Sequence, residues 1–252
     1  MSGTQLFLLI ASPFIGSFIS ASANSWPNWN KVLQSRSNCS HCQKRLQVRD
    51  LIPIASFLVL GGKCRFCSTA IGINHLLAEI FATLIAVFAV WVFSGSLVLV
   101  SVFLGWVLLF GALVDLRTRL LPDEMNFILI ITGLLVSFWQ GGGQGLLYAI
   151  LATIIGYGVF FIIAKLYLRL RGREGLGLGD AKLLAAGGAW LGPLALNWII
   201  LLGCVIALLG IITTSIYSRK RAKADAMISF GPALAMAIYL LWLIKGTSIG
   251  LL

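Results

Sequence analysis

Charged residues are scarce in this sequence, and acids are scarcer still. Of the 252 residues, 11% are charged, eight are Asp or Glu, and 59% are hydrophobic. Soluble domains carry about 25% charged residues, so this composition excludes an ordinary soluble enzyme and indicates a membrane protein with several spans. The short supply of acids also limits the residues to which acid-dependent chemistry can be assigned.

Basic residues are more numerous, and 19 Lys and Arg give the chain a net charge of +11. In a soluble protein this charge would suggest a nucleic-acid partner. Here the cations lie between apolar runs, where they set the orientation of membrane helices. We therefore expect a lipid bilayer as a partner, and no nucleic acid.

No Lys or Arg precedes the first apolar run, residues 6–19. The Ser-Ala-Ser-Ala stretch that follows resembles a signal-peptide cleavage site, but a signal peptide needs a basic segment before its apolar run. We therefore interpret the run as a membrane helix. Further apolar stretches of spanning length lie near residues 73–93, 97–114, 124–139, 144–166, 181–193, 195–217 and 227–247.

The sequence thus predicts an all-α polytopic membrane protein with about eight transmembrane helices. Residues 1–21 form the first helix, 22–72 a small polar domain between helices 1 and 2, and 73–252 a membrane domain of about seven helices. Within the polar domain, the apolar patch at 51–60 is too short to span a bilayer and is expected to pack inside the domain or to lie at the interface.

The positions of the basic residues predict the orientation of these helices, because cytoplasmic loops retain Lys and Arg. With the N-terminus outside and the polar domain inside, eighteen of the nineteen fall in inside loops, and only Lys245 lies near the outer face. The predicted outer turns at 94–96 and 141–144 carry no charge. Both chain ends are therefore expected outside the cytoplasm.

Four of the five cysteines form two CxxC pairs, Cys39 with Cys42 and Cys64 with Cys67. This spacing allows four thiolates to surround one structural Zn²⁺ ion. Because the loop is expected in the cytoplasm, where disulfides are disfavoured, a metal is favoured over two disulfides. His41 in place of one cysteine stays an alternative. The fifth cysteine stands alone in an apolar run, as a packing residue does.

Two of the acids are expected at the same depth near the inner face. Asp115 ends the third predicted helix, and Asp180 opens the sixth after alternating glycines. Two carboxylates that share one proton can hydrolyse a peptide, the ionised one activating water and the protonated one donating to the carbonyl oxygen. Gly177 and Gly179 lack side chains and would let an extended substrate approach closely.

Other interpretations of the acids stay open. Asp180 can cap its helix and Asp115 can simply end another. Asp123 follows Pro122 at a helix start, where capping is favoured. The chain as a whole can be a membrane transporter or a secretion-assembly scaffold, although the helix centres contain almost no ionisable residues for an ion route. Glu79 lies one or two turns inside a helix and needs a polar partner that the sequence does not identify.

Three segments resemble the type IV prepilin peptidases, the leader peptidases of type IV pilus and type II secretion systems, which are GxGD aspartic proteases. DLRTRLLPD, starting at Asp115, resembles the first catalytic segment of that family, and EGLGLGDAKLLAAGGAWLG at 174–192 the second. The cysteine loop, with DLIP at 50–53 between its two pairs, is similar to the family's zinc-binding cytoplasmic domain.

This resemblance implies a catalytic pair, Asp115 and Asp180, with Gly177 and Gly179 in the GxGD turn and the four paired cysteines on zinc. It implies a multi-pass protein of the bacterial inner membrane that removes the short basic leader of prepilins or pseudopilins at the cytoplasmic face, with its termini in the periplasm. Many members also methylate the new N-terminus with S-adenosylmethionine. Residues 19–27 differ from the family's usual Asn-containing stretch ending in Arg-Leu-Pro.

Overall fold

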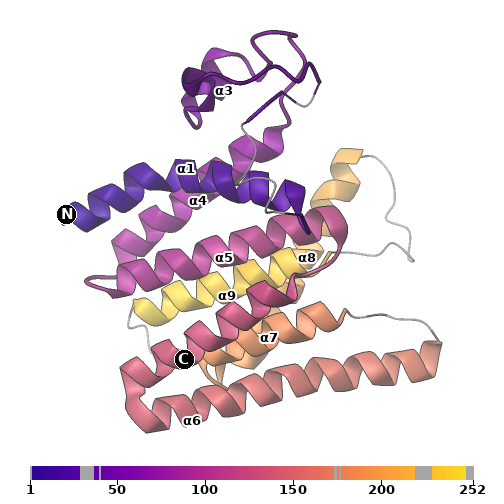
Figure 1. Ribbon diagram of the computed structural model, residues 1–252. Helices are drawn as coiled ribbons and strands as arrows, with labels where there is room; N and C mark the ends of the chain where they lie inside the picture. The colour runs from indigo at the N-terminus through magenta and orange to yellow at the C-terminus, as the bar shows by residue number, and fades with distance from the viewer. Residues whose placement is uncertain are drawn as a thin grey trace. The chain divides into compact units, whose positions relative to one another are not determined.

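The computed structural model describes residues 2–28, 37–39, 41–172, 175, 177–218 and 229–247, which form two compact units, Met1–Leu113 and Val114–Leu252. The described residues are almost entirely helical, with two isolated β-bridges and no strand (Figure 1), which confirms the predicted all-α fold. Glu174 and the basic run at 219–223 lie outside the described residues.

The first unit contains α1 (Gly3–Ser25), η1 (Val48–Leu51), α3 (Ala55–Val59), α4 (Ile73–Val92) and most of α5 (Leu97–Thr118). Helix α1 begins at a capping box, in which Ser2 and Gln5 bond each other's backbone N–H groups. It packs closely on α4. A Cβ added at Gly16 would stand only 2.7 Å from the Ala78 carbonyl oxygen. Small residues at the contact permit this close approach.

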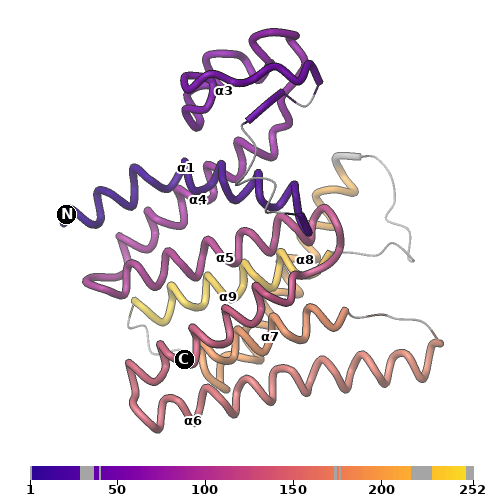
Figure 2. The backbone as a smooth tube through the Cα atoms, viewed as in Figure 1, coloured from indigo at the N-terminus to yellow at the C-terminus, as the bar shows by residue number. Residues whose placement is uncertain are grey.

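The second unit contains the last turn of α5, then α6 (Asp123–Arg171), α7 (Leu178–Leu191), α8 (Ala195–Ser218) and α9 (Gly231–Gly246). The smooth tube in Figure 2 shows α6 turning back on itself, and the turn occurs at Gly142 (φ 57°, ψ −146°). This turn separates the predicted spans at 124–139 and 144–166. It lies where the sequence predicted an outer turn.

Helix α7 is buried along nearly its whole length against α6, α8 and α9. A Cβ at Gly188 would stand 2.6 Å from the Ala152 carbonyl oxygen, so a glycine is needed for α7 to approach α6 this closely. The Trp190 indole donates to the Leu129 carbonyl oxygen (2.8 Å) and meets Trp242 edge-to-face. Helix α7 is therefore the central element of the unit and holds its first turn in a fixed position.

Five helices among the described residues are long and apolar enough to cross a membrane, judged by length and composition: α1, α4, α5, α6 and α8. Helix α6 carries two of the predicted spans. Helices α7 and α9, with 14 and 16 residues, match the predicted spans at 181–193 and 227–247 but are shorter than the roughly 20 residues of a typical span.

Candidate active site and metal centre

Asp115 lies near the end of α5 and is 5% exposed. The helix stops at Thr118, and Arg119 adopts a left-handed conformation (φ 59°) that turns the chain away. One oxygen of the carboxylate, Oδ2, accepts hydrogen bonds from the Ser229 hydroxyl and from the Gly231 N–H (3.1 Å). Asp115 is thus held by the start of α9 and does more than end a helix.

The sequence did not identify Ser229 and Gly231 as site residues. A Cβ at Gly231 would stand 2.7 Å from Asp115 Oδ2, so only glycine permits this contact without displacement. The signal that could have found them is the Gly-Pro pair that opens α9, since proline in the first turn marks a helix start and free N–H groups at a helix start attract anions.

Asp180 lies in the first turn of α7 and is half-buried. The N-cap of this helix is Gly177, whose carbonyl oxygen accepts the Asp180 N–H (3.2 Å), so Asp180 itself is not the cap. Its carboxylate lies close enough to that of Asp115 for the two to interact electrostatically. The structure therefore brings together the two acids that the sequence singled out, 65 positions apart in the chain.

Leu121 links the two sides of this site. Its side chain lies 3.1 Å from where a Cβ of Gly179 would stand and 3.2 Å from where a Cβ of Gly231 would stand. Gly179 therefore has a packing reason to be glycine. Gly177 is exposed. A Cβ added there would meet Asp180 Oδ2 at 3.6 Å and no other atom of the described residues within 4 Å. The predicted role of both glycines in substrate approach stays a prediction.

Asp123 pairs with Lys182 through a 2.6 Å ion pair between the start of α6 and the first turn of α7. The Asp123 side chain is 57% exposed, so the pair contributes little stability. The ion pair accounts for the charge of both residues without a role in proton transfer.

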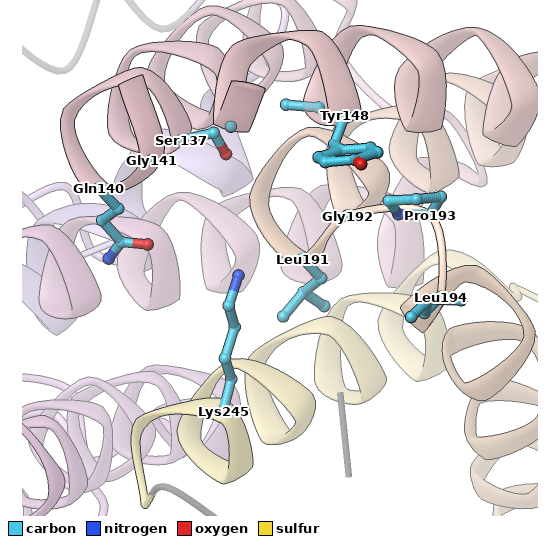
Figure 3. A pocket seen from close by; sticks show the side chains of 11 residues that line it. Ser137, Gln140, Gly141, Tyr148, Leu191, Gly192, Pro193, Leu194 and Lys245 are labelled. Carbon is cyan, nitrogen blue, oxygen red and sulfur yellow. The ribbon is translucent and has the colours of Figure 1, made fainter. Parts of the chain in front are cut away.

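A separate cavity lies at the opposite ends of α7 and α9, beside the turn in α6, with a volume of about 530 Å³. Figure 3 shows the Lys245 side chain extending from α9 into it, next to Leu191 and Gln140. The Lys245 amine donates to the Trp190 carbonyl oxygen at 3.4 Å. Because Asp180 and Gly231 lie at the other ends of these two helices, the cavity is not part of the paired-acid site.

The cysteine loop of the first unit contains the same turn twice. In each copy the residue before the first cysteine forms a bridge, Asn38 with Arg45 and Lys63 with Ala70. In each copy the residue after the second cysteine has a left-handed conformation, with φ 57° at Gln43 and 56° at Ser68. The backbone N–H of the first cysteine bonds a carbonyl five residues on in both copies. The two turns are therefore equivalent knuckles.

The ligand atoms of all four paired cysteines lie within 4.8 Å of one another. The sulfurs of Cys39 and Cys67 are 3.8 Å apart, which is the separation that a tetrahedron with Zn–S bonds of about 2.3 Å requires. His41 does not belong to the cluster. Cys204 is exposed on α8, so other residues of the chain do not cover it, and its interpretation as a packing residue stays a prediction.

The pKa values of the thiols in this cluster are shifted in opposite directions. Hydrogen bonds from the Cys42 and His41 backbone lower the pKa of Cys39, and those from Thr69 lower the pKa of Cys67 to about 6. The pKa of Cys42 is raised to about 11, although the Lys44 N–H acts to lower it, because burial and the nearby thiols disfavour further negative charge. A cation would relieve this repulsion, so the donor set fits a metal ion.

Asp50 fixes the second knuckle to η1. Its buried carboxylate accepts from Arg65, which stands between Cys64 and Cys67, at 2.7 Å. Burial acts to raise the pKa of Asp50, but the Arg65 guanidinium and the Gln47 N–H outweigh it and lower the pKa. The DLIP segment therefore supports the cysteine cluster through an ion pair that is formed at neutral pH.

Two family models match the chain: the bacterial peptidase A24 N-terminal domain over residues 10–93, and the type IV leader peptidase family over residues 102–214. The second match contains Asp115 and Asp180, and the first contains the four paired cysteines. The chain belongs to the type IV leader peptidase family, a class of membrane-bound leader peptidases.

Particular relatives agree with this assignment. The chain is 38% identical to a prepilin leader peptidase/N-methyltransferase of Burkholderia pseudomallei over 214 residues, covering 84% of this chain and 68% of the relative. It is 37% identical over 220 residues to the protein of that name in Aeromonas hydrophila, covering 86% and 74%.

It is also 33% identical over 206 residues to a type 4 prepilin-like proteins leader peptide-processing enzyme of Escherichia coli, covering 80% of this chain and 72% of the relative. No solved structure matches the chain significantly.

Proposed function

We propose that this protein is an integral-membrane aspartic endopeptidase that removes the short basic leader of prepilins or pseudopilins at the cytoplasmic face of the bacterial inner membrane. The observation that carries the proposal is that the Asp115 carboxylate, held by the start of α9, lies close enough to the Asp180 carboxylate for the two to interact electrostatically. The family and the names of its relatives supply the substrate class. The positions of the basic residues support a cytoplasmic site.

The surroundings of the two carboxylates differ, and this difference assigns their roles. Asp115 accepts two hydrogen bonds, from the Ser229 hydroxyl and the Gly231 N–H, which hold its carboxylate in place as an acceptor. No hydrogen bond to the half-buried Asp180 carboxylate is present among the described residues, which leaves this carboxyl group able to carry a proton and donate it to the substrate. Asp115 is therefore the base and Asp180 the acid at the start of the reaction.

The reaction then follows from these positions. Asp115 takes a proton from a water molecule whose oxygen attacks the scissile carbonyl carbon, while Asp180 gives its proton to the carbonyl oxygen. The tetrahedral intermediate collapses when the nitrogen of the leaving segment receives a proton and the C–N bond breaks. Each cycle leaves a new carboxylate on the leader and a new amine on the mature protein.

We also infer that the new N-terminus is methylated with S-adenosylmethionine. The names of the relatives pair the peptidase with an N-methyltransferase, and the matched segments include the N-terminal domain model. Bound S-adenosylmethionine would supply an electrophilic methyl group. The mechanism of cleavage does not depend on it.

The purified protein is expected to cleave a prepilin-type substrate in detergent. A substrate with a short basic leader followed by glycine should be shortened once, by the length of that leader, as read by mass spectrometry. Solute flux into vesicles is the matching test of the transporter alternative. Uncleaved substrate with folded, metal-loaded protein would contradict the proposal, and flux that survives loss of both aspartates would favour the alternative.

We propose that the four paired cysteines hold one structural Zn²⁺ ion, and we expect about one zinc per chain after purification under reducing conditions. Cys39→Ser and Cys64→Ser should each reduce the zinc content to near zero and lower the melting temperature, because a structural metal stabilises a small domain directly. Cys204→Ser, which changes a cysteine outside the cluster, should retain full zinc. Metal analysis by mass spectrometry gives the ratio, and unchanged zinc in Cys39→Ser would contradict the assignment.

A further inference from the structure

Glu79 is an acid in an unfavourable place. It lies on the face of α4 that packs against α1 and is 7% exposed, and the other buried positions of that face are all alanine. A Cβ at Gly16 of α1 would stand 2.7 Å from the Glu79 Cα, so the two backbones almost touch there. A buried carboxylate is costly unless it is protonated or meets a cation.

Only one group of the described residues bonds the Glu79 carboxylate. The Ile54 backbone N–H, at the entry to α3, donates to Glu79 Oε2 at 2.7 Å. Ile54 adopts φ 61° and ψ −55°, a conformation that a β-branched residue avoids. No cation pairs with Glu79 among the described residues, so the strained backbone holds an acid whose second oxygen is left for another partner.

Polar side chains also lie between α1 and α4, one turn from Glu79. His75, one turn before Glu79 on α4, lies 2.9 Å from the Ser20 hydroxyl through Nδ1 and 3.4 Å from the Asn24 amide through Nε2. The hydroxyl of Ser22 on α1 is buried and has no partner. Unsatisfied buried polar groups are rare and point to a missing ligand or water. The ends of α1 and α4 next to the cysteine loop therefore carry one acid with a single hydrogen bond and one buried hydroxyl without a partner.

We infer that Glu79 binds a primary ammonium group, namely the α-ammonium of the processed substrate, and positions it for methyl transfer. The inference rests on the proposed function, since cleavage creates that amine. An ammonium group supplies positive charge and three N–H donors, which match a carboxylate oxygen and nearby hydroxyls. A methyl donor of the sulfonium type also carries an ammonium group, and the experiment below separates the two sources.

The proton balance gives Glu79 a second task. An ammonium nitrogen has no lone pair, so it must lose a proton before it can attack, and the Glu79 carboxylate takes that proton. The freed lone pair of the nitrogen then forms the N–C bond to the methyl carbon, and the C–S bonding pair stays on sulfur, which becomes a neutral thioether. His75 fixes α1 to α4 beside this point and acts as a positioning residue.

Competition binding tests the inference without requiring methyl transfer. The probes are a peptide with the N-terminal sequence of a processed prepilin and its des-amino analogue, which lacks only the α-amine. Full-length wild-type protein is expected to bind the amine peptide about tenfold or more tightly than the analogue. In Glu79→Gln, whose amide oxygen can still accept the Ile54 N–H, the two affinities should agree within about twofold. Glu124→Gln, at an exposed acid of α6, should keep the wild-type preference.

Two further readouts on the same samples complete the test. Glu79→Gln should cleave the leader at a rate within about threefold of wild type, bind the methyl donor normally, and lose N-methylation by about 100-fold or more. The inference is overturned if wild type shows no preference for the amine, if Glu79→Gln keeps it, or if the variant instead loses methyl-donor binding. Failure of the proposed function would appear differently, as a wild-type protein that does not cleave.

Discussion

Asp115→Asn and Asp180→Asn are each expected to slow leader cleavage by at least about 1,000-fold. Asparagine has nearly the shape of aspartate, and at position 115 its amide oxygen can still accept the Ser229 and Gly231 hydrogen bonds. It cannot take up or release a proton under these conditions. The loss should therefore appear in kcat, measured with purified protein and saturating prepilin, while the melting temperature stays close to that of wild type.

Asp123→Asn is the matched control for this prediction. Asp123 lies near the same site in sequence and space, but its side chain is 57% exposed and pairs with Lys182. Exposed ion pairs contribute about 0–1 kcal/mol, so the variant should keep its cleavage rate within about threefold of wild type. If Asp123→Asn were as slow as Asp180→Asn, the site would contain three working acids and the assignment of roles would be wrong.

Gly231→Ala is expected to have the second largest effect, a loss of about 100-fold in kcat. The added Cβ would stand 2.7 Å from Asp115 Oδ2 and 3.2 Å from Leu121 Cδ1. Both distances are shorter than ordinary contacts, so the Asp115 carboxylate must move, and a displacement of about 1 Å in a reacting group can cost 100-fold. Steady-state kinetics on prepilin cleavage measure the loss.

Gly210→Ala provides the control for this change. Gly210 lies in α8, and no heavy atom lies within 4 Å of the position its Cβ would occupy. Alanine there removes no contact and favours a helix by about 1 kcal/mol, so activity should be unchanged. A Gly231→Ala protein that folds normally and keeps its full kcat would show that the contact between α9 and Asp115 is not needed for catalysis.

The proximity of Asp115 and Asp180 could be predicted from the sequence because each acid stands at the end of a long apolar run. Alternating helix directions bring such ends to one face, and the scarcity of acids left few alternatives. The cysteine cluster could be predicted for a similar reason, since two CxxC pairs allow few other arrangements than a shared metal. The zinc itself and the catalytic roles stay predictions that the experiments above address.

The hydrogen-bond partners of Asp115 and Glu79 could not be predicted from the sequence in the same way. Ser229 and Gly231 are an uncharged hydroxyl and a glycine more than a hundred positions from Asp115, and no periodicity connects them. The partner of Glu79 is a backbone N–H, which every residue except proline carries, so no sequence pattern could name Ile54. Backbone groups become specific only after the fold has placed them.

The apolar patch at 51–60 shows another limit of the sequence. It was expected to pack inside the small domain or to lie at the interface, yet Leu58 and Val59 of α3 are 67% and 83% exposed. Composition alone does not tell whether a short apolar helix faces a core or the surroundings, because a five-residue helix has no face long enough to set a period. The exposure excludes packing inside the domain for these two residues and leaves the interface prediction standing.

The cleavage rate of the double variant Asp115→Asn/Asp180→Asn, compared with both single variants, tests the central claim most directly. If the two carboxylates act as one catalytic unit, loss of either removes the whole reaction, and the double variant should be as slow as each single variant within about threefold. Losses that multiply in the double variant would show two independent contributions. A single variant that cleaves at the wild-type rate would contradict the account outright.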